Sequence, residues 1–132
     1  MGSAPGRNAL LISGILLVLG GLVGAYMLYD LFYFIEYNDV WDDMSTFFDV
    51  MLFITFYQIL IGIIGAVCCN RLSMGKYLLA FGVLQILMVV GVQLFNILVM
   101  GDSISFNNAV SFLLPFYYAS GAKKNHDALK AN

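Results

Sequence analysis

Residues 9–35 read ALLISGILLVLGGLVGAYMLYDLFYFI, a stretch of 27 residues with a single charged side chain, Asp30. About 20 consecutive apolar residues in an α-helix are enough to cross the roughly 30 Å of hydrocarbon in a bilayer. The stretch is too long for the apolar core of a signal peptide, and it ends in aromatic residues instead of a small-residue cleavage site. It therefore predicts a retained first membrane-spanning helix.

The composition of the whole chain agrees with this interpretation. Of 132 residues, 61% are hydrophobic and 11% are charged, whereas a soluble domain has about 45–50% and about 25%. Water cannot solvate such a surface, so we expect membrane lipids to cover it. The chain is long enough for one domain, and it has no basic stripe of the kind that would indicate nucleic acid as a partner.

Three further apolar stretches follow, at about 46–69, 77–100 and 105–122. The last is the shortest and the least apolar, and it contains Pro115. The runs are continuous, whereas the strands of a membrane barrel alternate. Short loops between them favour antiparallel neighbours. The sequence thus predicts an all-α fold: one domain, an antiparallel up-down bundle of four transmembrane helices, with a polar cytoplasmic tail at 123–132.

The basic residues predict the orientation of these helices. Loops rich in Lys and Arg stay in the cytoplasm. The two predicted outer loops contain Asp39, Asp42, Asp43 and Asp102, and neither contains Lys or Arg. All the basic residues fall on the other side: Arg7, Arg71, Lys76, Lys123, Lys124 and Lys130. We therefore expect a multi-pass protein of the cell membrane with both termini in the cytoplasm.

Small residues predict where the helices touch, because contacts between helices in lipid depend on close backbone approach. Gly20 and Gly24 form a GxxxG pair in the first helix, and Gly62 and Gly65 share a stripe of the second. Packing within the bundle is the favoured interpretation. Association of two copies through Gly20 and Gly24 is the alternative.

Polar side chains inside the apolar stretches concentrate toward the outer surface. Polar groups at membrane depth are costly and tend to be functional. An outward-facing pocket would suit a cation, a proton or an amine. The competing interpretation is ordinary polarity at the membrane interface, where tyrosines are common. The candidate ligand-binding residues are Asp30, Asp49, Tyr26, Tyr33, Gln93 and Asn96.

Two glutamines, Gln58 and Gln85, fall near the predicted midplane of the membrane. Polar groups at that depth either bond to neighbouring helices or belong to a site. We treat both as candidate polar residues of the bundle centre.

Catalytic and metal-binding patterns are missing from the sequence. The only histidine, His126, lies in the predicted tail, so no Ser/His/Asp set can form. Cys68 and Cys69 are adjacent and lack the spacing of a metal site. They are interpreted as small apolar residues, with acylation near the membrane as the alternative. We expect no enzyme activity, no cofactor and no bound metal.

Three classes of function remain. The first is an accessory or structural subunit that acts through a partner membrane protein or as a homo-oligomer. The alternatives are a small transporter or channel, and a binder of a lipid or cation in the outer leaflet around Asp30. The sequence favours the first class because it offers packing features and no chemistry.

Overall fold

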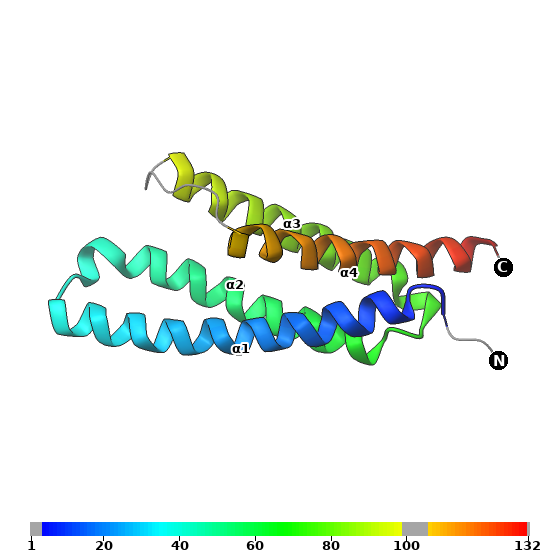
Figure 1. Ribbon diagram of the computed structural model, residues 1–132, viewed down its shortest axis with the longest axis horizontal. Coiled ribbons are helices and arrows are strands. Elements are labelled where there is room, and N and C mark those ends of the chain that lie inside the picture. Colours follow the sequence, from blue (N-terminus) through cyan, green and yellow to red (C-terminus); the bar gives the residue numbers. More distant parts are fainter. Residues whose placement is uncertain (1–3, 99–105, 132) are drawn as a thin grey trace.

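The computed structural model describes residues 4–98 and 106–131. These residues form four α-helices and one short 3-10 helix, and successive α-helices run in opposite directions (Figure 1). The predicted all-α class is confirmed. The elements are α1 (Arg7–Asn38), α2 (Trp41–Val67), η1 (Leu72–Met74), α3 (Gly75–Leu98) and α4 (Phe106–Ala131).

Among the described residues, three segments are long and apolar enough to cross a membrane: α1, α2 and Leu72–Phe95. The fourth helix differs from them in composition and in position. It begins about halfway along α1 and α2 and ends beside the two termini (Figure 1). Three of the four predicted spans are therefore supported by length and apolarity.

The connection between α1 and α2 is much tighter than predicted. It consists of Asp39 and Val40, and Asp39 adopts the left-handed conformation with φ 51°. The expected loop between 35 and 46 is thus mostly helical. Asp42 and Asp43 occupy the first turn of α2, where the positive end of the helix dipole favours carboxylates.

The fourth helix extends beyond its predicted end at about residue 122 and continues to Ala131 without a break, so residues 123–131 of the predicted polar tail are helical. Asn125 is fully buried and His126 is partly buried. The polar composition of this segment suggested a solvated tail. Its helical form follows from packing against the first residues of the chain and the α2–α3 connection.

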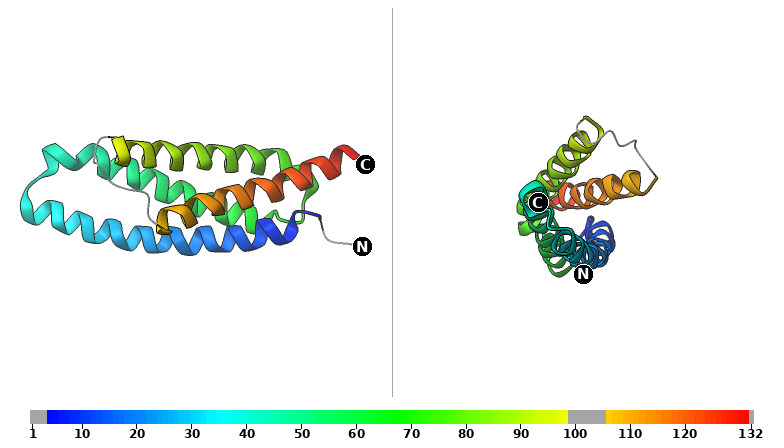
Figure 2. Two further views of the ribbon diagram at one scale, coloured as in Figure 1. Left: turned by 45° about the horizontal axis from the view of Figure 1, so that its top comes forward. Right: turned by 90° about the vertical axis from the view of Figure 1, so that its left-hand side faces the viewer.

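The molecule consists of two helical hairpins, α1–α2 and α3–α4, that pack together at the end where both termini lie. Contacts are most extensive within the hairpins and sparse between α2 and α3. The core sits at the termini end and includes Leu10, Leu78, Tyr118 and Ala122. Away from that end the hairpins diverge (Figures 1 and 2).

Side chains that donate to backbone carbonyls join the helices across the core. Tyr118 Oη donates to the carbonyl oxygen of Ile61 at 2.8 Å, and Tyr57 Oη donates to that of Phe81 at 2.7 Å. A carbonyl in a helix has a second lone pair free for such a bond. These bonds tie α4 to α2 and α2 to α3 in a region where apolar packing alone would give little specificity.

Candidate functional site

The six predicted ligand-binding residues do not converge on one pocket in the described structure. Asp30 and Asp49 are both exposed, on α1 and α2 respectively. The exposed fractions of Tyr26 and Tyr33 are 67% and 56%. Gln93 is half-buried on α3, and the side chain of Asn96 lies outside the described residues.

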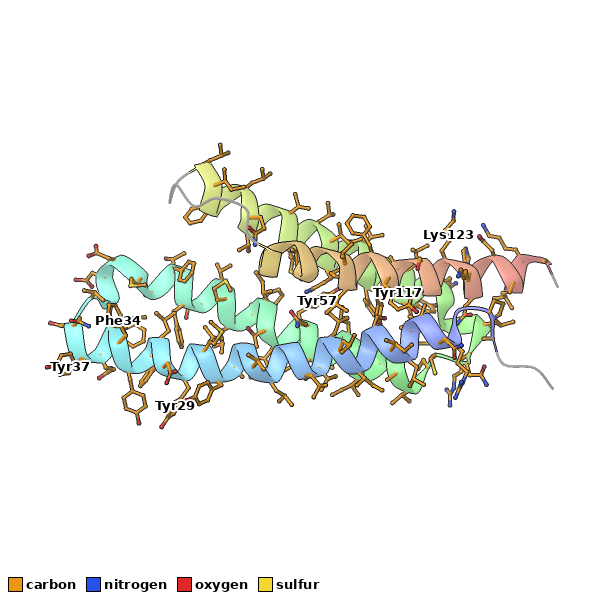
Figure 3. All side chains as sticks on the ribbon, in the orientation of Figure 1. Tyr29, Phe34, Tyr37, Tyr57, Tyr117 and Lys123 are labelled. Atoms are coloured by element: carbon orange, nitrogen blue, oxygen red, sulfur yellow. The ribbon has the colours of Figure 1, made fainter. Side chains whose placement is uncertain are left out.

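Two tyrosines of α1, Tyr29 and Tyr33, contact each other. Tyr29 Oη donates to Tyr33 Oη at 3.0 Å, and their ring centroids are 4.8 Å apart in an edge-to-face arrangement. Tyr29 and Tyr37 point away from α2, whereas Phe34 points toward it (Figure 3). This face of α1 is an aromatic surface, as expected for the membrane interface.

Two apolar grooves flank α2 in the half of the molecule far from the termini. The α1/α2 groove has a volume of about 490 Å³ and is lined by Gly24, Met27, Leu28, Asp30, Leu31, Phe34, Phe47, Met51 and Thr55. The α2/α3 groove has a volume of about 520 Å³ and is lined by Asp43, Thr46, Phe47, Val50, Met51, Phe53, Ile54, Met88, Gly91, Val92 and Phe95. Both volumes fall in the range of small-molecule sites, roughly 300–1,000 Å³.

Each groove contains one carboxylate in an otherwise uncharged lining. Asp30 lines the α1/α2 groove, and Asp43 lines the α2/α3 groove. Neither groove is lined by Asp49 or Gln93. The arrangement suits a molecule that is mostly apolar, and it differs from the polar pocket that the sequence suggested.

The two midplane glutamines lie together between the hairpins. Gln58 Nε2 donates to the carbonyl oxygen of Leu17 at 3.0 Å, and Gln85 Nε2 lies 3.5 Å from Gln58 Oε1. Gln85 is 1% exposed, and its Oε1 has no hydrogen-bond partner among the described residues. Gln58 thus joins α1 to α2, while Gln85 is a buried and incompletely paired amide.

The predicted packing glycines face other helices of the same chain. A Cβ at Gly20 would lie 3.0 Å from Gln58 Nε2, and one at Gly24 would lie 3.6 Å from the Thr55 hydroxyl oxygen. Gly65 lies against the ring of Tyr118. In this structure the Gly20 and Gly24 face is therefore directed toward α2.

One close approach between the backbones of α1 and α2 involves Gly14, a glycine that the sequence did not single out. A Cβ on Gly62 would lie 2.7 Å from the carbonyl oxygen of Gly14, and a Cβ on Gly14 would lie 2.6 Å from that of Gly62. The same apolar run also contains Ser13, Gly20, Gly21 and Gly24, so several alternative pairs of small residues were equally plausible from sequence. Only the register of the two helices selects this one.

Sequence reasoning also missed a buried junction made by Gly6, Cys69 and Asn125, which we call the Asn125 junction. Asn125 Oδ1 accepts from the backbone N–H of Gly6 at 2.7 Å, and Asn125 Nδ2 donates to the carbonyl oxygen of Cys69 at 3.0 Å. The junction joins three segments that are distant in sequence. No local pattern in 123–131 indicates it.

The described part of the chain contains no cluster of three or more His, Cys, Asp or Glu side chains that could hold a metal ion. Cys68 and Cys69 are free thiols, the first half-buried and the second buried. The grooves therefore remain the strongest candidates for a functional site.

No protein-family model, no curated protein and no solved structure matches this chain. The residues that the structure describes form a small helical protein, in which three helices are long and apolar enough to cross a membrane.

Proposed function

We propose that the protein is a non-catalytic membrane protein that holds a lipid-like molecule in the outer half of its bundle. The observation that carries this proposal is the pair of apolar grooves on either side of α2, where the two hairpins diverge. A polar pathway, as a transporter or channel would need, has less support because the linings are apolar.

The orientation within the membrane is part of the proposal. Arg7, Arg71 and the lysines of α4 belong to the end of the molecule where the termini lie, and Lys123 projects outward there (Figures 1 and 3). The opposite end carries the acidic α1–α2 turn. This distribution supports a cytoplasmic location for both termini and an even number of crossings, four in total. The grooves then open in the outer leaflet.

The shape of the α1/α2 groove favours an occupant from the bilayer. Met27, Phe34 and Met51 contribute flexible or broad apolar surfaces to its lining, and Met side chains adapt to irregular apolar ligands. Asp30 is the only charged residue of the lining. An alkyl or ring system would occupy the groove, with its polar part near this carboxylate.

The test is to identify what remains bound after gentle purification. The protein would be extracted in a mild detergent and examined by native mass spectrometry for retained lipid-like molecules. Gly24→Phe should displace the molecule, because Gly24 lines the α1/α2 groove and its Cβ position meets nothing closer than 3.6 Å. Ala25→Phe is the matched control, since Ala25 is exposed and lines neither groove. A wild-type protein that retains no specific small molecule would contradict the proposal.

A second candidate is the accessory subunit, which the exposed aromatic surface of α1 favours. The Tyr29–Tyr33 pair is already ordered by its own hydrogen bond, so little entropy would be lost on contact with a partner helix. A partner protein should co-purify with the chain in a fixed ratio. Tyr29→Leu should prevent this co-purification. Leu19→Phe, at an exposed position nearer the termini, should leave it unchanged. A monomer without a partner in mild detergent would argue against this role.

A further inference from the structure

The α2/α3 groove is polarised along its length. On α2 its lining begins at Asp43, in the first turn of the helix, and continues to Ile54. The eleven steps from Asp43 to Ile54 rise about 16 Å along the helix at 1.5 Å per residue. The groove thus has a carboxylate at one end and apolar side chains along the remainder, which is the layout of a single-chain amphiphile.

No basic residue close in sequence balances the negative charge of Asp43 at the end of the groove. No Lys, Arg or His occurs between Asn8 and Asn70. Within that segment lie six acidic residues, of which Asp43 lines the groove: Asp30, Glu36, Asp39, Asp42, Asp43 and Asp49. Clefts with one sign of charge and low-dielectric walls concentrate the opposite ion. The occupant should therefore be a cation and not an anion.

The apolar lining also favours a positively charged head group. Phe47 lies four residues, about one helical turn, beyond Asp43 in the lining, and the face of such a ring attracts an ammonium group within about 6 Å. Met51 and Met88, further along the groove, add adaptable apolar surface for a tail.

Gly91 supplies open space for an occupant. Of the described glycines of the helices, Gly91 is the one whose Cβ position has nothing within 4 Å. It lies on α3 in the groove lining and is exposed. Glycines in membrane helices usually mark a place where another group packs closely against the backbone. At Gly91, no residue in the described part of the chain occupies that place.

We propose that the α2/α3 groove binds a long-chain ammonium amphiphile, with its head group at Asp43 and its tail along Phe47, Ile54 and Gly91. This inference rests on the proposed function and names the chemical class of the ligand. Asp43 acts as the counter-ion that selects a cationic amphiphile over a neutral or anionic one with the same tail.

The test uses three probes with the same brominated C16 tail and different head groups: trimethylammonium, hydroxyl and sulfate. The protein is reconstituted in nanodiscs of zwitterionic lipid. Trp41, the only tryptophan, lies two residues from Asp43 and packs against Phe32 and Phe48 at centroid distances of 5.5 and 5.7 Å. Bromine on the tail carbons next to the head group should quench its emission when the probe is bound. We expect saturable quenching by the ammonium probe at a mole fraction about tenfold lower than for the hydroxyl or sulfate probes, as one charge pair near a protein surface can supply.

Paired variants distinguish the effect of the Asp43 charge and of the groove shape from a general effect on folding. Asp43→Asn should remove the advantage of the ammonium probe, whereas Asp42→Asn should retain it, because Asp42 shares the first turn of α2 and lines neither groove. Gly91→Phe should abolish saturable quenching by every probe, and Leu94→Phe, at an exposed position outside the lining, should not.

The failure of this inference is distinguishable from the failure of the proposed function. Equal binding of all three probes, or an unchanged preference in Asp43→Asn, would overturn the cation selectivity and leave a lipid-like ligand in place. Quenching of Trp41 that never saturates, together with no retained molecule in native mass spectra, would overturn both. A partner helix that protects Gly91 from the probes in the wild-type protein would also overturn the inference.

Discussion

The backbone N–H of Gly6 donates to the side-chain oxygen of Asn125 across 119 residues of sequence, at 2.7 Å and away from solvent. The same side chain donates to the carbonyl oxygen of Cys69. One amide therefore pairs a backbone donor before α1 with a backbone acceptor after α2. It links both hairpins at the end opposite the grooves.

Asn125→Ala should lower the free energy of unfolding by about 2–6 kcal/mol, because it leaves two buried backbone groups without a partner at roughly 1–3 kcal/mol each. Titration with SDS in mixed micelles measures this change. The control is Asp127→Ala, an exposed change on the same helix, for which we expect less than about 0.5 kcal/mol. Equal effects of the two variants would show that the Asn125 junction contributes nothing.

Gly62→Ala should destabilise the α1–α2 hairpin, because the added methyl group would lie 2.7 Å from the carbonyl oxygen of Gly14. Backbone must shift to relieve this contact, and overpacking of this kind typically costs about 1–3 kcal/mol. Gly91→Ala meets open space and should leave the SDS midpoint unchanged or raised. A stable Gly62→Ala variant would mean that the helices of this hairpin pack less closely than the structure has them.

Tyr118→Phe should cost about 1 kcal/mol, the usual net value of one hydrogen bond, since the ring would still pack while the bond to Ile61 is lost. Tyr118→Ala should cost several times more, because the ring is fully buried. The neighbouring Tyr117 is 42% exposed, so Tyr117→Phe provides the matched comparison in the same unfolding assay. The prediction fails if both Phe variants behave alike.

Gln85→Leu separates a structural role from a functional one. Gln85 Oε1 is buried without a partner and its Nε2 makes a long bond of 3.5 Å, so an apolar side chain of similar size should be neutral or stabilising by up to about 1 kcal/mol. Gln58→Leu should instead destabilise, because it loses the bond to Leu17. If Gln85→Leu lost the ligand retained in native mass spectra while its stability was unchanged, the residue would belong to a binding site.

The sequence was sufficient to predict four helices in the correct order, because a continuous apolar run of about 20 residues has few possible structures other than a helix. It was less reliable at the helix ends. Asp42 and Asp43 suggested a loop, yet carboxylates are also favourable in the first turn of a helix, and a two-residue turn at Asp39 allowed α2 to begin early.

Contacts between distant segments were beyond the reach of sequence patterns. Asn125 stands in a polar segment with the composition of a tail, and only its position against Gly6 and Cys69 makes it a core residue. The sequence grouped Asp30, Asp49 and Gln93 into one candidate site because their predicted depths in the membrane are similar. Depth does not determine which faces of α1, α2 and α3 are directed toward one another. Asp43 was placed in a loop because the start of α2 was misjudged, and the groove that it lines depends on the divergence of the hairpins.

The Asn125 junction also constrains the order of events during synthesis. The first helix can enter the membrane as soon as it leaves the ribosome, but Gly6 finds its acceptor only after residue 125 has been translated. Until then the two hairpins lack this link, and an incomplete chain carries an unpaired donor ahead of α1. A chain truncated before residue 125 would therefore leave two buried backbone groups, the N–H of Gly6 and the carbonyl oxygen of Cys69, without the side chain that pairs them in the finished protein.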